Sequence, residues 1–150
     1  MPGFLGAYEH QLDDKGRVAL PAAFRKDADE GPLVLMHGWE DLQLSLLPKP
    51  VWGQVLEGLM ELRRTGETAA HQVRRLLARA TEVTPDKQGR ILLPAPLQEA
   101  AGLSVSGAVV LHGNIDRIEL WNPARFRATI ETVPAEDREM MARFKNRLML

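Results

Sequence analysis

Two short stretches of the sequence carry the same charged pattern, Asp-x-x-Gly-Arg. The first reads LDDKGRVALP over residues 12–21, and the second reads TPDKQGRILLP over residues 84–94. In each stretch a carboxylate and a guanidinium lie on either side of a glycine, which can take the positive φ of a tight turn. The pattern predicts two turns, with turn residues Asp13, Gly16, Asp86 and Gly89 and basic residues Lys15, Arg17, Lys87 and Arg90.

The charged side chains of these turns have two candidate roles. Short acidic side chains accept hydrogen bonds from backbone N–H groups in turns, and an ionised carboxylate has no proton to offer a phosphate. We therefore interpret Asp13 and Asp86 as structural. The lysines and arginines either form ion pairs with acids or donate hydrogen bonds to phosphate oxygens and to the guanine edge in the major groove of DNA. The residue types alone favour neither role.

The repeated pattern belongs to a longer duplication. An offset of 73 residues aligns both turns, the prolines that follow them and the alanines after those prolines. Further along, LVLMHGWED at residues 33–41 resembles VVLHGNID at residues 109–116, with an offset of 75 residues. Two units are too few for a solenoid. The sequence therefore predicts two related halves, and we expect each half to complete the hydrophobic core of the other.

Both halves have the same predicted order of elements. AYEHQL and RVALP indicate two short strands joined as a hairpin by DDKG, and EVTPDKQGRILLP is the counterpart in the second half. PAAFRK and PAPLQEAAG carry proline near the start, which is typical of a short helix, and Gly102 suits the end of the second one. The apolar runs PLVLMHG and AVVLHG predict strands that end near His37 and His112, with LQLSLL and RIELW as their partners. The order β-β-short α-β-β, followed by a helix, occurs twice.

Apolar residues at helical spacing predict further helices outside this repeat. A break near Thr65 and Gly66 divides the region between the halves into a helical hairpin. From Ala135 onward, apolar side chains fall on one helical face and basic side chains elsewhere, and this helix could pack on its own subunit or on a neighbouring one. The apolar residues of this last helix are Met140, Met141, Phe144 and Leu148.

The composition limits the classes of protein to which the chain can belong. With 150 residues, 45% of them hydrophobic, the chain can form a packed core. A formal net charge of -1 predicts no overall attraction to nucleic acid or to acidic membranes, so any such binding must come from local clusters of charge. There is no cysteine, the first ten residues lack a secretory signal pattern, and no apolar run is long enough to cross a bilayer. We therefore expect a soluble cytoplasmic protein with no membrane partner.

No motif in the sequence predicts catalysis or a cofactor. The sequence contains no G-x-x-x-x-G-K-[ST] phosphate loop, no G-x-G-x-x-G dinucleotide motif and no G-x-S-x-G nucleophile motif. Asp13 and Asp14 are neighbours in a turn and point apart, so they do not form an acid/base pair. The four histidines lack the spacing of metal ligands. We predict that the protein is not an enzyme and has no cofactor, no catalytic residues and no metal site.

Three longer stretches resemble one known family. FLGAYEHQLDDKGRVALPAAFR, DKQGRILLPAPLQEAAGL and IELWNPARF resemble the MraZ family of bacterial regulators, and each half is similar to the AbrB-type regulators. The resemblance extends from about Phe4 to Phe126. It implies an α+β fold, a duplicated AbrB-like swapped-hairpin β-barrel with a helical hairpin between the halves and a C-terminal helix. The corresponding segments are residues 1–50, 51–80, 81–126 and 127–150.

The same resemblance implies a function. Members of the family form ring-shaped homo-oligomers that bind several direct repeats in double-stranded DNA upstream of their own division and cell-wall operon, which they usually repress. Transferred by position, the DNA-contacting residues are Lys15, Arg17, Lys87 and Arg90. Because Gln88 follows Lys87, the lysines of the two halves are not in register. A ring would repeat a local basic patch many times, which reconciles DNA binding with the near-neutral charge. The expected location is the cytoplasm, in association with the nucleoid.

A second hypothesis is a protein-interaction module, antitoxin-like or a scaffold, without specific DNA readout. Its docking surface would be the Met-rich C-terminal helix, since methionine adapts to irregular partners.

Overall fold

The computed structural model describes residues 3–28, 31–38 and 40–150, so Trp39 of the LVLMHGWED match lies outside the described residues. The first part of the chain forms β1 (Ala7–Gln11), β2 (Arg17–Ala19), α1 (Ala22–Ala28), β3 (Leu33–Met36), β4 (Leu44–Leu47), α2 (Lys49–Arg63) and α3 (Glu67–Ala78). The second part forms β5 (Ala80–Val83), β6 (Arg90–Leu92), α4 (Ala95–Ala100), β7 (Ala108–Asn114), β8 (Arg117–Trp121) and α5 (Pro123–Phe126). A π-helical turn (Arg127–Glu131), a 3-10 turn (Ala135–Asp137) and α6 (Arg138–Arg147) complete the chain. The predicted α+β class is confirmed.

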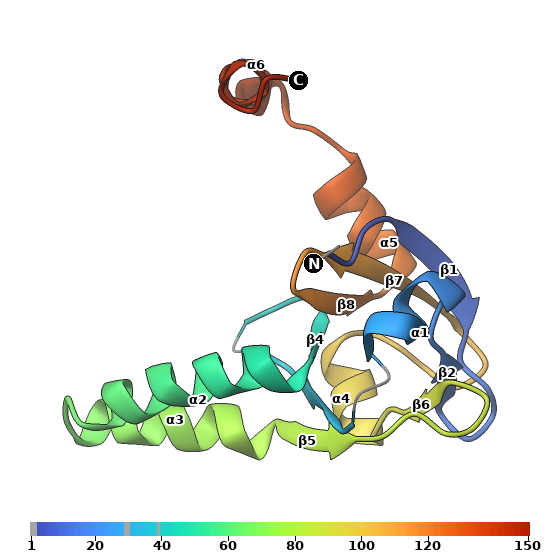
Figure 1. Cartoon of the computed structure of the whole chain (residues 1–150), viewed down its shortest axis with the longest axis vertical. Coiled ribbons are helices and arrows are strands. Elements are labelled where there is room, and N and C mark those ends of the chain that lie inside the picture. The colour runs from blue at the N-terminus through green and yellow to red at the C-terminus, as the bar shows by residue number, and fades with distance from the viewer. Residues whose placement is uncertain (1–2, 29–30, 39) are drawn as a thin grey trace.

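Strands of the two halves pair with each other in both sheets. The six-stranded sheet has the order β1-β7-β8-β4-β3-β5, and β2 pairs with β6 in a separate two-stranded sheet, here called the β2–β6 ribbon. All of these pairs are antiparallel. Because β1 pairs with β7, β4 with β8 and β2 with β6, the two halves are interlocked rather than arranged one after the other (Figure 1).

The predicted hairpins were wrong in their strand pairing. Both turns form, and each is closed by a backbone hydrogen bond, from Asp13 N to Arg17 O and from Asp86 N to Arg90 O, each 2.9 Å long. The strands on either side of each turn then separate, since β1 and β5 belong to the six-stranded sheet whereas β2 and β6 pair with each other. A local alternating pattern identifies a strand but not its partner. Here burial of the inward side chain of β2 requires β6 of the other half.

One hydrophobic core contains side chains from both halves, as the duplication predicts. Leu35 and Leu46 from the first half are fully buried together with Ile91 and Leu111 from the second. The prolines after β2 and β6 cannot continue a strand ladder, and they start the short helices α1 and α4 that close over this core. Gly102 ends α4 with a φ of 69°, in the left-handed region that favours glycine.

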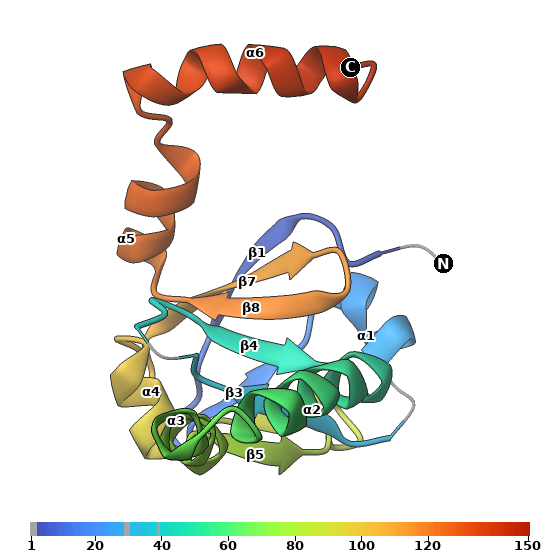
Figure 2. The same ribbon diagram turned by 90° about the vertical axis from the view of Figure 1, so that its left-hand side faces the viewer.

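The longer helices lie outside the core. The predicted helical hairpin is present as α2 and α3, in which Leu59 and Val73 are the buried residues. Figure 1 and Figure 2 show this hairpin at one end of the long axis of the molecule and α6 at the other. Every residue from 127 to 150 is exposed. The C-terminal helix therefore makes little contact with the body of its own subunit.

The two repeat-related histidines occupy different places. His37 directly follows β3, as predicted, but His112 lies inside β7, two residues before its end. The expectation for His112 was wrong because β7 is longer than β3. Its pairing with both β1 and β8 continues through His112, which lies opposite Ala7 and Glu119.

The shared core predicts that the two halves unfold together. Ile91→Ala removes a fully buried side chain and is expected to lower the free energy of unfolding by about 2–5 kcal/mol in a single transition. Urea denaturation followed by circular dichroism and by tryptophan fluorescence measures both quantities. Leu92→Ala, at a neighbouring position that is 55% exposed, is the control and should change stability little. Two separate transitions would contradict the shared core.

Candidate nucleic-acid interface

The β2–β6 ribbon places the two repeated arginines on one outer face. In its register Arg17 lies opposite Leu92, Val18 opposite Ile91 and Ala19 opposite Arg90. Val18 and Ile91 point inward and are fully buried, so the alternation of side chains in a strand directs Arg17 and Arg90 outward together. The two arginines are diagonal neighbours across the ribbon. The Cα atoms of diagonal neighbours in an antiparallel pair are roughly 7–8 Å apart. Two guanidinium groups from distant parts of the chain therefore share one surface.

Each aspartate holds its turn and its arginine at the same time. Oδ1 of Asp13 accepts hydrogen bonds from the backbone N–H groups of Lys15 (2.9 Å) and Arg17 (2.8 Å). Oδ2 of Asp13 accepts a hydrogen bond from Nε of Arg17 at 2.7 Å. The arginine donates to Asp13 through Nε, so the N–H groups of its two terminal nitrogens remain as further donors.

The second turn repeats this arrangement. Oδ1 of Asp86 accepts from the backbone N–H groups of Gln88 and Arg90, both at 2.9 Å, and Oδ2 accepts from Nε of Arg90 at 2.9 Å. In each turn the backbone N–H of the arginine is the main cause of a lowered aspartate pKa. Together with the side-chain hydrogen bond from the same arginine and the second backbone N–H, it lowers the pKa of Asp13 from its ordinary value of 3.8 to about 2, and the equivalent contacts lower the pKa of Asp86. Hydrogen bonds to the ionised carboxylate stabilise that form.

The two turns are also fixed to one another. The backbone N–H of Leu20 donates to the carbonyl of Gly89 at 2.9 Å, and that of Leu93 donates to the carbonyl of Gly16 at 2.9 Å. Each turn is therefore bonded to the strand of the other half. The separation of Arg17 and Arg90 is set by the backbone of the ribbon rather than by two independent loops.

Both turn glycines have a backbone conformation that favours glycine, and a side chain of the other half lies close to each. Gly16 and Gly89 have φ of 80° and 75°, which side chains other than hydrogen rarely allow. A Cβ on Gly16 would lie 2.5 Å from Nε2 of Gln98, and a Cβ on Gly89 would lie 2.6 Å from Nε of Arg25. A side chain at either position would therefore strain the turn.

Arg25 and Gln98 are neighbours of the site that sequence reasoning missed. Nε of Arg25 donates to the carbonyl of Leu20 at 3.0 Å, and Nε2 of Gln98 donates to that of Leu93 at 2.7 Å. The two residues are 73 positions apart, so they occupy equivalent places in the repeat. Each covers the glycine of the other half's turn, and Arg25 adds a guanidinium beside Gly89. Extending the offset of 73 residues by three positions beyond the aligned alanines, Ala22 and Ala95, would have found this pair.

The two lysines occupy different corners of their turns. Both side chains are exposed. The backbone N–H of Lys15 donates to Asp13, and in the second turn the equivalent donor is the N–H of Gln88. Lys87 consequently takes the place that Asp14 has in the first turn. The basic side chains of the two turns are therefore arranged differently around the two similar arginines.

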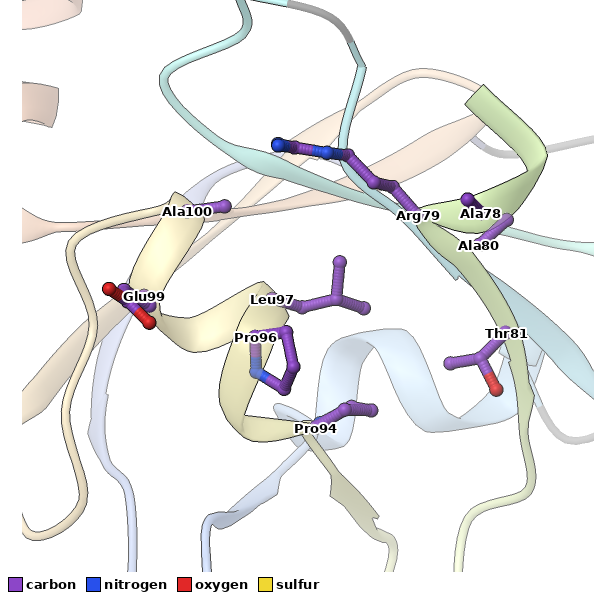
Figure 3. Close-up of a pocket in the computed structure, with 9 residues that line it drawn as sticks. All are labelled: Ala78, Arg79, Ala80, Thr81, Pro94, Pro96, Leu97, Glu99 and Ala100. Atoms are coloured by element: carbon purple, nitrogen blue, oxygen red, sulfur yellow. The ribbon is translucent and has the colours of Figure 1, made fainter. Parts of the chain in front are cut away.

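A cavity lies beside this interface rather than in it. A cavity of about 610 Å³ lies between the junction of α3 with β5 and the helix α4 (Figure 3). Its lining includes Pro94, Pro96 and Leu97, with Arg79 and Glu99 as its charged residues. Among residues 3–28, 31–38 and 40–150, no group of three or more acidic, histidine or cysteine side chains could hold a metal ion. No helix of the described part of the chain is long and apolar enough to span a membrane.

Comparison with known proteins identifies the family. The model of the family described as MraZ protein matches the chain twice, over residues 4–75 and over residues 76–148. The chain belongs to the MraZ family. The two MraZ matches meet inside α3, so the family model counts α2 and most of α3 with the first repeat. The segment boundaries expected from the sequence, with a separate helical hairpin at residues 51–80, remain a prediction.

Individual MraZ relatives are similar over most of their length. The chain is 38% identical over 133 residues to the protein named Transcriptional regulator MraZ of Herpetosiphon aurantiacus, which covers 89% of this chain and 90% of the relative. It is 39% identical over 131 residues to the protein of the same name from Thermus thermophilus, covering 87% and 90%. The protein of that name from Thermomicrobium roseum is 41% identical over 133 residues, covering 89% and 91%.

The lowered pKa of Asp13 predicts a specific dependence of stability on pH. Because the pKa is lower in the folded than in the unfolded protein, the ionised carboxylate contributes stability that is fully present above about pH 4 and is lost as the pH falls from about 4 to 2. Asp13→Asn should lower the melting temperature by several degrees at pH 7 and flatten its dependence on pH in this window. Thermal melts between pH 2 and pH 7 measure both effects.

The matched control is Asp14→Asn, which makes the same change of charge at an exposed neighbour in the same turn. It should leave the melting temperature within about a degree of the wild type at pH 7, since surface substitutions usually change stability little. Equal effects of the two substitutions would refute a turn-forming role for Asp13.

Proposed function

We propose that this protein is a sequence-specific, DNA-binding transcriptional regulator that contacts the duplex with the outer face of the β2–β6 ribbon. The observation that carries the proposal is the pair Arg17 and Arg90, each held by an aspartate and both on one face of a two-stranded ribbon. The relatives named as transcriptional regulators support the same function. The residues that make contact would be Lys15, Arg17, Lys87 and Arg90, as the sequence predicts.

The shape and chemistry of the ribbon suit the major groove. That groove admits a two-stranded β-ribbon, and arginine commonly donates two hydrogen bonds to O6 and N7 of guanine. With Nε bound to the aspartate, the terminal nitrogens of Arg17 and Arg90 are available to bases or phosphates. The exposed lysines at the two turns suit phosphate contacts, which position a protein on DNA without reading its sequence.

The near-neutral charge of the chain is compatible with this function if several subunits bind together. We therefore propose, as a finer part of the same function, a ring-shaped homo-oligomer that binds several direct repeats in the promoter of its own division and cell-wall operon and represses it. Each ring would present many copies of the same basic patch along one duplex. The protein would then act in the cytoplasm at the nucleoid. The pairing of β2 with β6 between the halves supports a swapped-hairpin barrel as the architecture of the DNA-binding part of each subunit.

Removing both arginines should weaken DNA binding without unfolding the protein. Arg17→Ala/Arg90→Ala is expected to reduce affinity for DNA from upstream of the protein's own gene by at least about tenfold, since each good bidentate contact contributes about 1–3 kcal/mol of discrimination. The preference over a scrambled duplex and the steepness of the salt dependence should both fall. Fluorescence anisotropy titrations at several salt concentrations measure all three quantities.

The matched control is Arg74→Ala/Arg75→Ala, which removes two exposed arginines on α3, away from the ribbon and from the row of α2 that carries Glu57 and Glu61. It should bind DNA as the wild type does. Melting curves must show that both variants are folded. If the folded wild type does not bind the upstream DNA at low salt, the ribbon has only a structural role. The protein-interaction hypothesis then replaces the proposed DNA-binding function.

The number of repeats in the DNA should control affinity. A duplex with several direct repeats is expected to bind at least about tenfold more tightly than a duplex with one repeat, because contacts by further subunits of the same ring become intramolecular. Competition titrations with duplexes of equal length measure the difference. Equal affinity for one repeat and for several would contradict the ring while leaving recognition of a single site intact.

A further inference from the structure

The C-terminal helix α6 presents two adjacent rows of side chains to solvent. Met140 and Phe144, which are 56% and 47% exposed, form an apolar row at a spacing of four residues. Arg143 and Arg147 form a basic row beside it, with Glu139 one turn before Arg143. Burial of an apolar row of this kind normally stabilises a helix. The structure leaves this row uncovered within its own subunit.

The outward face of α2 carries a complementary pattern. Glu57 and Glu61 form an acidic row at the same spacing of four residues, with Arg64 at the end of the helix. Beside it lie Gly58 and Leu62, and Leu62 is 41% exposed. A hollow of about 390 Å³ runs along this face.

Two glycines on α2 have no explanation within the subunit. Gly53 and Gly58 lie inside the helix, where glycine is less stable than alanine, and a Cβ at either position would meet no atom within 4 Å. Gly53 lies one turn before Glu57 in the same row, and Gly58 lies beside Glu57. A surface without side chains at these positions lets another helix approach closely.

We propose that α6 of one copy of this protein packs antiparallel along the outward face of α2 of a second copy. In an antiparallel pair Arg147 meets Glu57, Arg143 meets Glu61, and Glu139 meets Arg64. A helix rises by about 1.5 Å per residue, so both rows have the same repeat of about 6 Å and stay in register. The apolar row of α6 then lies over Gly58 and Leu62. A parallel pair would set Glu139 against the acidic row.

The partner is a second copy because the two surfaces are at opposite ends of one molecule. Figure 1 and Figure 2 both place α6 at the far end of the long axis from α2. Each subunit donates one α6 and accepts another on α2, so the contact joins different surfaces head to tail. Repetition of such a contact closes a ring when the rotation between subunits allows it. The inference thus rests on the proposed oligomer and names the contact that holds it together.

Charge reversal tests this contact. Arg143→Glu/Arg147→Glu and, separately, Glu57→Arg/Glu61→Arg should each shift the protein to smaller species in sedimentation velocity and weaken self-association by at least about tenfold. The chain that carries all four substitutions should recover the assembly, because the acidic and basic rows are then exchanged. Failure of the fourfold variant to recover assembly, while it melts as the wild type does, would overturn the proposal.

The control reverses two other charges on the same helix. Arg138→Glu/Lys145→Glu makes the same change of charge on the opposite edge of α6 and should leave the assembly intact. Dissociation of this control to the same extent, or a wild type that is monomeric at micromolar concentration, would refute the contact. Binding of every variant to a duplex with a single repeat is measured in parallel. A variant that no longer assembles but still binds the single repeat supports the contact. A wild type that does not bind the single repeat contradicts the proposed function and leaves the contact between subunits to be judged by sedimentation alone.

Discussion

The pairing of β2 with β6 is the constraint on which the rest of the structure depends. Val18 and Ile91 are fully buried in the shared core, and each lies in a three-residue strand that has no other partner in the described sheets. Short strands of this kind need tertiary packing to be stable. The same pairing puts Arg17 and Arg90 on one outer face and bonds each turn to the opposite strand. Core formation and the geometry of the candidate interface therefore have one cause.

An acidic residue beside each arginine is consistent with a surface that binds an anion. The carboxylate of Asp13 accepts three hydrogen bonds from its own turn, which partly neutralise its charge and hold it against the turn. Its partner Arg17 is held through Nε before any ligand arrives. Fixing a long side chain in advance lowers the entropy lost on binding, and the exposed edge of the guanidinium stays available. In the proposed function the aspartates would therefore position the arginines for DNA rather than compete with it.

The turns could be predicted from the sequence, whereas their surroundings could not. The spacing of Asp13 and Gly16 encodes a local structure, and the structure has that turn twice. Strand pairing is decided by distant residues, so the alternating pattern around each turn suggested a hairpin that does not form. The contact of Arg25 with Gly89 also joins distant positions, and only the repeat itself contained a signal for it. Local spacing therefore predicted the two turns, whereas long-range packing determined which residues surround them.

The duplication is imperfect at the residues that surround the two arginines, and this has a consequence for the DNA sequence that the ribbon could read. One turn is covered by the neutral Gln98 and the other by the cationic Arg25, while Lys15 and Lys87 stand at different corners. A DNA-binding surface with true twofold symmetry recognises a palindromic DNA sequence. A ribbon with unequal ends distinguishes the two directions of a duplex, so each subunit should bind in one orientation. Direct repeats would offer that orientation again at every site, as the proposed head-to-tail ring of identical subunits requires.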